Sequence, residues 1–210
     1  MNFEDKFVEL ILSKSFKNVF NPYTDICGTY DKSNAEKIRL DNLRSYLIQM
    51  ENIQPNVLWI GAALGHRGGR RTGLPFIDDK HIATLSKIYA IQNLQSACKT
   101  KMNEMTASQV WKFVIKLPKN KLPFFWNIFP YHPHKPGAPF TNRQLISSEI
   151  LEVHEIIKLL SNHFGFESIL SIGKKSHVTL KQMGFLSTYI RHPSHGGANI
   201  FQKQLREIYF

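Results

Sequence analysis

Hydrophobic and polar positions along the chain follow two different periods. Short apolar runs between Pro or Gly residues are typical of strands buried on both faces of a parallel sheet. Such runs predict strands at 57–60, 124–129 and 168–172, and a fourth strand is expected at 187–191. Apolar residues at helical spacing predict helices at about 3–11, 35–49, 80–95, 106–116, 146–163 and 174–183, and a terminal one after Gly197. This alternation predicts a three-layer α/β/α sandwich with a central, mostly parallel four-stranded sheet.

Length and composition suggest how the chain is organised. Its 210 residues suit a single domain over 1–210, in which residues 1–50 form an N-terminal helical elaboration. The hydrophobic fraction of 42% supplies a full core and argues against general disorder. The first residues have the pattern of an amphipathic helix rather than a signal peptide, and no apolar run is long enough to span a bilayer. Cys27 and Cys98 are too few for a disulfide framework, which favours a reducing cytoplasm. We expect a soluble protein that is a monomer.

The charge balance points to the class of partner. The chain has 27 Lys and Arg residues against 16 Asp and Glu residues, which gives a formal net charge of +11. An excess of this size favours a polyanionic partner, most simply nucleic acid. A basic surface that only maintains solubility would give the same numbers.

Three loops have unusual compositions, and all three follow predicted strands. Ligands of parallel α/β sheets bind at the carboxyl ends of the strands. The loops at 61–79, 127–143 and 192–199 leave the first, second and fourth strands at that edge. Their position makes them the best candidates for a binding or catalytic site.

The first loop is rich in glycine and arginine. Its glycines allow the backbone to approach a ligand closely, although no Gly-Lys-Ser/Thr follows them as in a Walker phosphate loop. Phe76, at its end, is either an ordinary core residue or a platform on which a base could stack. The arginines of this loop are Arg67, Arg70 and Arg71.

The second loop begins at a polar residue inside an apolar strand. A buried amide such as that of Asn127 must be satisfied by the protein or face a ligand. Its carbonyl could accept N3–H of uracil while its NH₂ group donates to O4. Further along, His132 and His134 have no carboxylate or cysteine nearby, which favours plain loop residues over a metal site. We expect neither a metal nor a cofactor.

The third loop has the sequence RHPSHGGAN. His192 directly follows the fourth strand, where a ligand would bind. Small residues and backbone N–H groups at the following helix N-terminus suit contact with a DNA phosphate, although an ordinary strand-to-helix turn would look the same. The residues concerned are Ser194, His195, Gly196, Gly197 and Asn199.

Together the three loops resemble the motifs of the uracil-DNA glycosylase superfamily. Its first motif is matched by 61–65 and by the Gly-x-Pro-Phe at 73–76, and its His-Pro-Ser motif is intact at 192–194. The strand asparagine of the family matches Asn127. The resemblance covers about 55 to 210, and the region 21–50, with its NPY sequence, resembles a bacterial subgroup without iron–sulfur cysteines.

The resemblance implies a role for each matched residue. Phe76 would stack on a flipped base, Asn127 would read its Watson–Crick edge, and His192 would stabilise charge on O2. Gly61 and Gly65 would shape the base pocket, and Gly65 stands where uracil-strict relatives carry a tyrosine, which implies tolerance of 5-substituted uracils. Residues 194–199 would lie in the minor groove, and Arg67, Arg70 and Arg71 would lie near phosphates of double-stranded or single-stranded DNA.

One part of the first motif departs from the family. Ala62 and Ala63 stand where relatives carry an acid or amide that acts on water or on the sugar cation. By the resemblance, Asp79 or its neighbour Asp78 would supply the missing acid. With no lysine implicated, the expected enzyme is a monofunctional glycosylase that leaves an abasic site.

Two other functions compete with this one. The acid-free first motif favours a glycosylase-fold protein that binds damaged or single-stranded DNA without chemistry. A small-molecule hydrolase that uses His192 would need a nucleophile and base at a recognisable spacing, which the sequence lacks.

Overall fold

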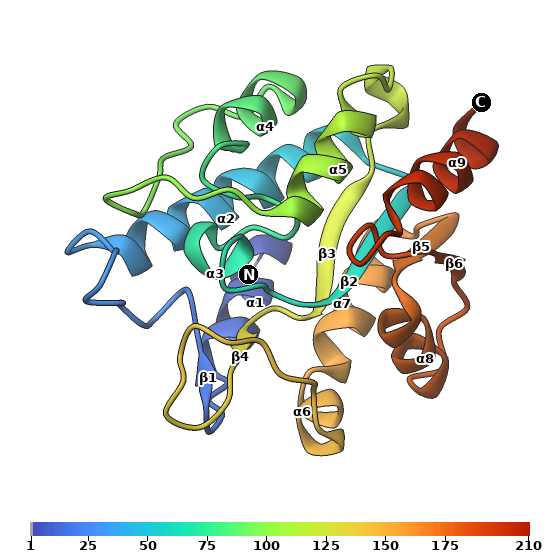
Figure 1. Ribbon diagram of the computed structural model, residues 1–210. Helices are drawn as coiled ribbons and strands as arrows, with labels where there is room; N and C mark the ends of the chain where they lie inside the picture. Colours follow the sequence, from blue (N-terminus) through green and yellow to red (C-terminus); the bar gives the residue numbers. More distant parts are fainter. Residues whose placement is uncertain (1) are drawn as a thin grey trace.

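The computed structural model describes residues 2–210 and contains one four-stranded parallel sheet. The strand order is β3-β2-β5-β6, and every neighbouring pair is parallel, which confirms the predicted fold class (Figure 1). Its strands are β2 (Val57–Ala63), β3 (Phe124–Phe129), β5 (Ser168–Ile172) and β6 (Thr188–Ile190). The register pairs Gly61 with Asn127, which brings the first and second predicted loops together.

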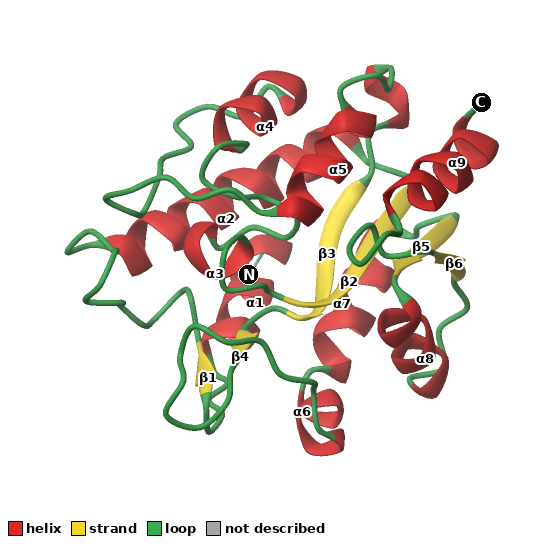
Figure 2. Ribbon diagram, in the orientation of Figure 1, coloured by secondary structure: helices red, strands yellow, loops and turns green. Residues whose placement is uncertain are grey.

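Helices flank the sheet along most of the chain (Figure 2). They are α1 (Phe3–Leu12), α2 (Ala35–Ile53), α3 (Gly69–Thr72), α4 (Ile82–Tyr89), α5 (Met105–Val114), α6 (Ser147–Glu152), α7 (His154–Phe164), α8 (Lys174–Gln182) and α9 (Ala198–Tyr209), with a 3₁₀ turn at Lys119–Lys121. A small antiparallel pair joins β1 (Val19–Phe20) to β4 (His132–Pro133).

The helices form a layer on each face of the sheet. The connection from β2 to β3 runs toward one edge of the sheet. The connections from β3 to β5 and from β5 to β6 run toward the opposite edge. Right-handed crossovers therefore place α5 on one face and α7 and α8 on the opposite face. Helix α9 packs against α5, and α1 packs against α7 (Figure 1).

Aromatic side chains of successive strand residues fill both layers. On β3, the Phe125 ring packs against Trp111 of α5, while the Trp126 ring packs against Phe7 of α1. Alternate residues of a strand point to opposite faces, so Asn127 shares the face of Phe125. Trp59 on β2 is fully buried and donates from Nε1 to the hydroxyl of Tyr209, 2.7 Å away.

Several element boundaries differ from the prediction, for local reasons. Helix α4 ends at Tyr89 because Ala90 adopts a left-handed conformation with φ 55°. The helix expected at 146–163 is two helices that meet at Val153, whose φ and ψ are −102° and 0°. The short α3 inside the glycine-rich loop and the β1–β4 pair were not predicted, because such short elements have no apolar period to detect.

No helix within residues 2–210 is both long enough and apolar enough to cross a membrane.

Candidate active site

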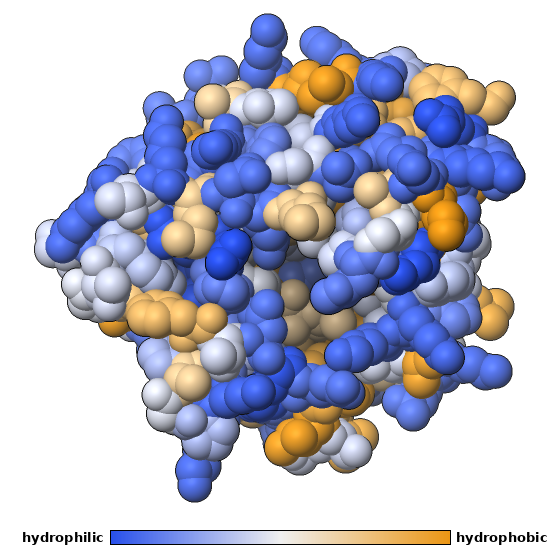
Figure 3. Space-filling model, in the orientation of Figure 1, coloured by the Kyte–Doolittle hydropathy of each residue, from blue (hydrophilic) through white to orange (hydrophobic). Residues whose placement is uncertain are grey.

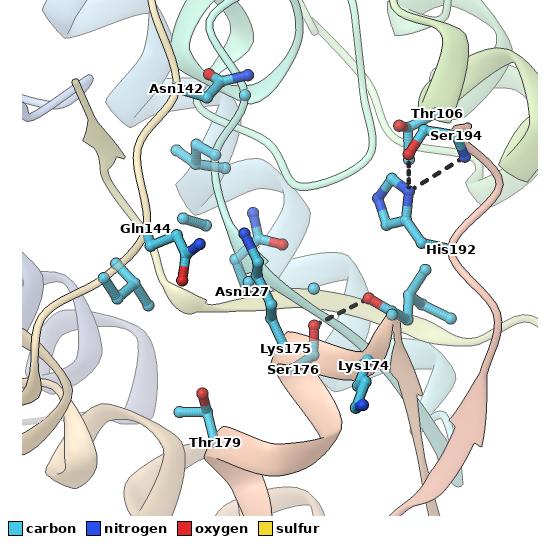
Figure 4. Close-up of a pocket in the computed structure, with 18 of the residues that line it drawn as sticks. Thr106, Asn127, Asn142, Gln144, Lys174, Lys175, Ser176, Thr179, His192 and Ser194 are labelled. Atoms are coloured by element: carbon cyan, nitrogen blue, oxygen red, sulfur yellow. Dashed lines mark hydrogen bonds between the residues drawn. The ribbon is translucent and has the colours of Figure 1, made fainter. Parts of the chain in front are cut away.

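The carboxyl ends of the strands open into a cavity of about 820 Å³. Figure 3 shows it as a hollow on this face of the molecule, with mostly hydrophilic side chains around it. Parts of all three predicted loops line it, together with the N-terminal turn of α8 and the start of α5 (Figure 4). Its size is typical of a site for a small ligand.

Gly61 is the point at which two predicted site residues meet. A Cβ atom added to Gly61 would overlap Oδ1 of Asn127 and would lie 3.0 Å from Cζ of Phe76. Gly61, in the second half of β2, therefore leaves the space in which the amide and the ring come together.

Phe76 has features of both a core residue and a site residue. Its side chain is only 8% exposed, and its ring packs edge-on against Phe125 at 5.8 Å, yet it also lines the cavity. Its φ is 59°, a left-handed conformation that is costly for a residue with a bulky side chain. The carbonyl of Phe76 accepts a hydrogen bond from Nε1 of Trp111, which helps to hold this backbone.

The amide of Asn127 is available for a ligand. The residue is 3% exposed and lines the cavity, and none of the hydrogen bonds found within residues 2–210 involves its side-chain amide. A buried amide without an internal partner normally has a ligand or water as its partner.

His192 lies on the wall of the cavity formed by the third loop. Its Nδ1 accepts a hydrogen bond from the backbone N–H of Ser194 at 3.2 Å and lies 2.7 Å from the Ser194 hydroxyl (Figure 4). This arrangement assigns the ring proton to Nε2. Burial, with the nearby charges of Arg191 and His195, lowers the pKa of His192 to about 4. The ring is therefore a neutral donor at physiological pH.

The first motif contributes no acid to the cavity, and neither does the aspartate pair that follows it. Ala62 and Ala63 line the cavity, whereas Asp78 and Asp79 lie outside it and are buried. Asp79 pairs with Arg71 at 2.5 Å and accepts from the backbone N–H of Met102. The expectation that Asp79 supplies the missing acid is thus corrected: its carboxylate is fully engaged away from the cavity.

Asp78 holds another loop in place. It accepts hydrogen bonds from the backbone N–H of Glu104 at 2.7 Å and from the ring of His81. Burial alone would raise the pKa of Asp78, but these hydrogen bonds outweigh it and keep the pKa below its usual value. The carboxylate therefore stays ionised and fixes the start of α5.

Two of the three loop arginines point inward. Arg70 is 3% exposed, and its guanidinium lies 4.1 Å from the centre of the Phe20 ring. Arg71 is 1% exposed and bonds to Asp79 and to the carbonyl of Thr100. Neither guanidinium is at the surface to meet a phosphate, which corrects that expectation, whereas Arg67 is exposed.

The third loop is only partly at the cavity. Ser194 and His195 line it, and His195 has a left-handed φ of 51°. Gly196 and Asn199 are exposed, and Gly197 is packed against the carbonyl of His192, where a side chain would not fit. The loop therefore presents part of its backbone and of its polar side chains beside the cavity.

Several polar residues that line the cavity were not predicted from the sequence, some of them within the predicted loops and some on other elements. These are Glu104, Thr106, Asn142, Arg143, Gln144, Lys174, Lys175, Thr179 and Arg191. The lysines follow β5 directly, so the rule that led to the other loops would have found them. Glu104 gave no such signal, because it precedes a helix and follows no strand.

The histidines of the second loop lie beside this region. His132 is fully buried between Arg70 and the carbonyl of Thr141. No group of three or more His, Cys, Asp or Glu residues within residues 2–210 is arranged to hold a metal ion.

The architecture, an α/β fold with a four-stranded parallel sheet flanked by helices, is shared with a solved structure. Among solved structures, the wild-type SMUG2 of Pedobacter heparinus matches with a TM-score of 0.66 at 14% sequence identity, and the match covers 100% of this chain and 97% of that chain. At this identity the likeness shows the fold. No family model matches the sequence, and neither does any protein of curated function.

Proposed function

We propose that this protein is a DNA glycosylase that removes uracil, or a related deaminated or 5-substituted base, by hydrolysis of the N-glycosidic bond. The observation that carries the proposal is the meeting of Phe76 and Asn127 at Gly61, with His192 on the wall of the same cavity. A base can reach such a cavity only after it leaves the duplex stack. The fold shared with SMUG2 supports the same class of function.

Each of the three side chains has a distinct task in this proposal. The ring of Phe76 stacks on the flipped base, which is worth roughly 1–3 kcal/mol. Asn127 accepts from N3–H and donates to O4. The neutral Nε2–H of His192 donates to O2 as negative charge develops there, so its contribution grows as the glycosidic bond breaks.

The basic rim supports DNA as the partner. The rim contains Lys174, Lys175 and Arg191, and Arg67 is exposed on the first loop. Positive side chains around an active site attract the phosphates that flank a flipped nucleotide. We place the backbone N–H groups of the third loop against the same strand.

A binding protein without chemistry is the second candidate. It is favoured by Ala62 and Ala63, which leave the first motif without an acid. Such a protein would keep Phe76, Asn127 and the basic rim, and it would bind a flipped base without releasing it.

A cleavage assay separates the two candidates. Fluorescent DNA with uracil opposite G, opposite A or in a single strand, and matched DNA with 5-hydroxymethyluracil, would be incubated with excess protein and then treated with alkali. We expect alkali-dependent breaks at uracil and at the 5-substituted base. Strand breaks that form before alkali would contradict hydrolysis by water alone. Tight binding with no breaks in any substrate would identify the binding protein.

A further inference from the structure

One carboxylate lies in the cavity. Among the lining residues within 2–210, Glu104 is the only Asp or Glu. It sits at the residue before α5, in a segment that the glycosylase motifs do not include. The other lining residues are apolar, amide, hydroxyl or basic, so Glu104 is the one acidic side chain among those described.

The first loop leaves room for this carboxylate. A Cβ atom at either Gly65 or Gly68 would overlap an oxygen of Glu104. The carboxylate thus lies against the backbone of the glycine-rich loop, directly after the two alanines of the first motif. Any other residue type at Gly65 or Gly68 would take its place.

The position of Glu104 does not serve the stability of the fold. Its side chain makes no capping hydrogen bond to α5, and no donor within residues 2–210 bonds to either carboxylate oxygen. Only its backbone is held: its N–H donates to Asp78, and its carbonyl accepts from Ser108. A half-buried carboxylate without a protein donor has a free acceptor for water or ligand.

The electrostatic surroundings favour a proton acceptor. Burial, and then the negative charge of Asp78, raise the pKa of Glu104 to about 7. A general base works best when its pKa is close to the working pH, because it then exists partly in the basic form and still holds a proton well.

We propose that Glu104 is the catalytic base of this protein and replaces the acid missing at Ala62 and Ala63. The inference rests on the proposed glycosylase function. In the step, a carboxylate oxygen of Glu104 takes one proton from water, and the water oxygen forms a bond to C1′ of the flipped nucleotide. The bond from C1′ to the base nitrogen breaks, and its electron pair leaves with the base. The base anion, held by His192 at O2, then takes a proton from solvent.

The primary test compares Glu104→Gln with the wild type in single-turnover cleavage of uracil DNA from pH 5.5 to 8.5. The wild-type rate should rise with pH and level off above about pH 7. Glu104→Gln should be slower by about 100-fold or more at pH 8 and should lose this rise. Glu155→Gln, an exposed carboxylate on α7, is the matched control and should behave as the wild type.

A second variant displaces the carboxylate without removing it. Gly65→Ala would push the flexible end of Glu104 aside, so its thermal unfolding should match that of the wild type while cleavage falls as in Glu104→Gln. Gly28→Ala, where an added methyl meets no atom within 4 Å, is its control. Formate, a small carboxylate, should partly restore cleavage by Glu104→Ala.

The outcomes distinguish this inference from the function on which it rests. Cleavage by Glu104→Gln within threefold of the wild type, or a reduced rate with the same rise near pH 7, would overturn the role of Glu104 and leave the glycosylase function standing. A wild type that cleaves none of the substrates, at any pH, would overturn both.

Discussion

The proposed contribution of His192 depends on its remaining neutral. Since the pKa of this side chain is lowered to about 4, the imidazole carries no charge from pH 6 to 8, and its Nε2–H is available at every pH in that range. Any pH dependence of cleavage above pH 6 must therefore come from another group. In the Glu104→Gln background the rate should be flat from pH 6 to 8, and a remaining rise there would show that a group other than Glu104 titrates in this range.

Replacement of His192 should affect the reaction more than the binding. His192→Ala removes the one neutral donor that we assign to O2, and loss of such a donor costs about 2.7–4 kcal/mol, or roughly 10²–10³ in rate. Binding of DNA that carries an uncleavable uridine analogue should change little. Single-turnover rates and fluorescence anisotropy would measure the two effects. Equal losses in rate and in binding would contradict a role specific to the transition state.

Gly61 offers a test of the base pocket that leaves the chemistry intact. In Gly61→Ala the added methyl would occupy the position of Oδ1 of Asn127 and press on Phe76. We expect the Kd for uracil DNA to rise by tenfold or more, because both residues assigned to the base are displaced. Circular dichroism would check the fold. Unchanged affinity in a folded variant would show that the base does not bind at this point.

At the scale of single residues, cavity-lining residues could be predicted where an unusual side chain stands in a strand or directly after one. Asn127 and His192 could be predicted because an amide inside an apolar strand and a histidine directly after a strand are unusual. Arg70 and Arg71 were misplaced because sequence charge alone does not distinguish an exposed guanidinium from one paired with a buried aspartate. Glu104 reaches the cavity only through the packing of a loop against Gly65, which no local pattern encodes.

At the scale of elements, the strands were predictable and the short helices were not. The apolar runs of β2, β3 and β5 are long enough to be read without a structure, because both faces of each strand are buried. The turn from Gly173 into α8 was overlooked, although it follows a strand as the other site loops do. Gly173 has a φ of 96°, and a Cβ there would lie 3.2 Å from Cβ of His192.

The start of α8 should contribute directly to DNA affinity. Lys174 and Lys175 are exposed and line the cavity, so we expect each to neutralise one phosphate. The double variant Lys174→Ala/Lys175→Ala should bind more weakly and reduce the slope of log K against log salt by about 2. Fluorescence anisotropy titrations at salt concentrations from about 50 to 300 mM would measure the affinity and this slope. Lys158→Ala on α7, also exposed, is the control, and an unchanged slope in the double variant would remove α8 from the interface.

At the scale of the whole molecule, buried neutral histidines should make the fold sensitive to acid. His132 is fully buried, and burial together with the charge of Arg70 lowers its pKa to about 3. Its Nε2–H donates to the carbonyl of Thr141, which leaves Nδ1 facing Arg70 at 3.4 Å and penalises a second proton. In the unfolded chain the pKa returns to about 6.5, so the unfolded state binds more protons below that pH.

The sign of this effect determines the expected result. The stability contributed by neutral His132 is fully present above about pH 6.5 and is lost as the pH falls toward 3, with a loss of about 2 kcal/mol by pH 5. Glu104 acts in the opposite sense, because its raised pKa favours the folded state at low pH and loses that effect as the pH rises to 7. Urea unfolding at pH 7.5 and 5.0 should therefore show a smaller acid loss in His132→Asn than in the wild type, and a larger one in Glu104→Gln. Equal losses in all three proteins would mean that neither side chain is held in its neutral form by the fold.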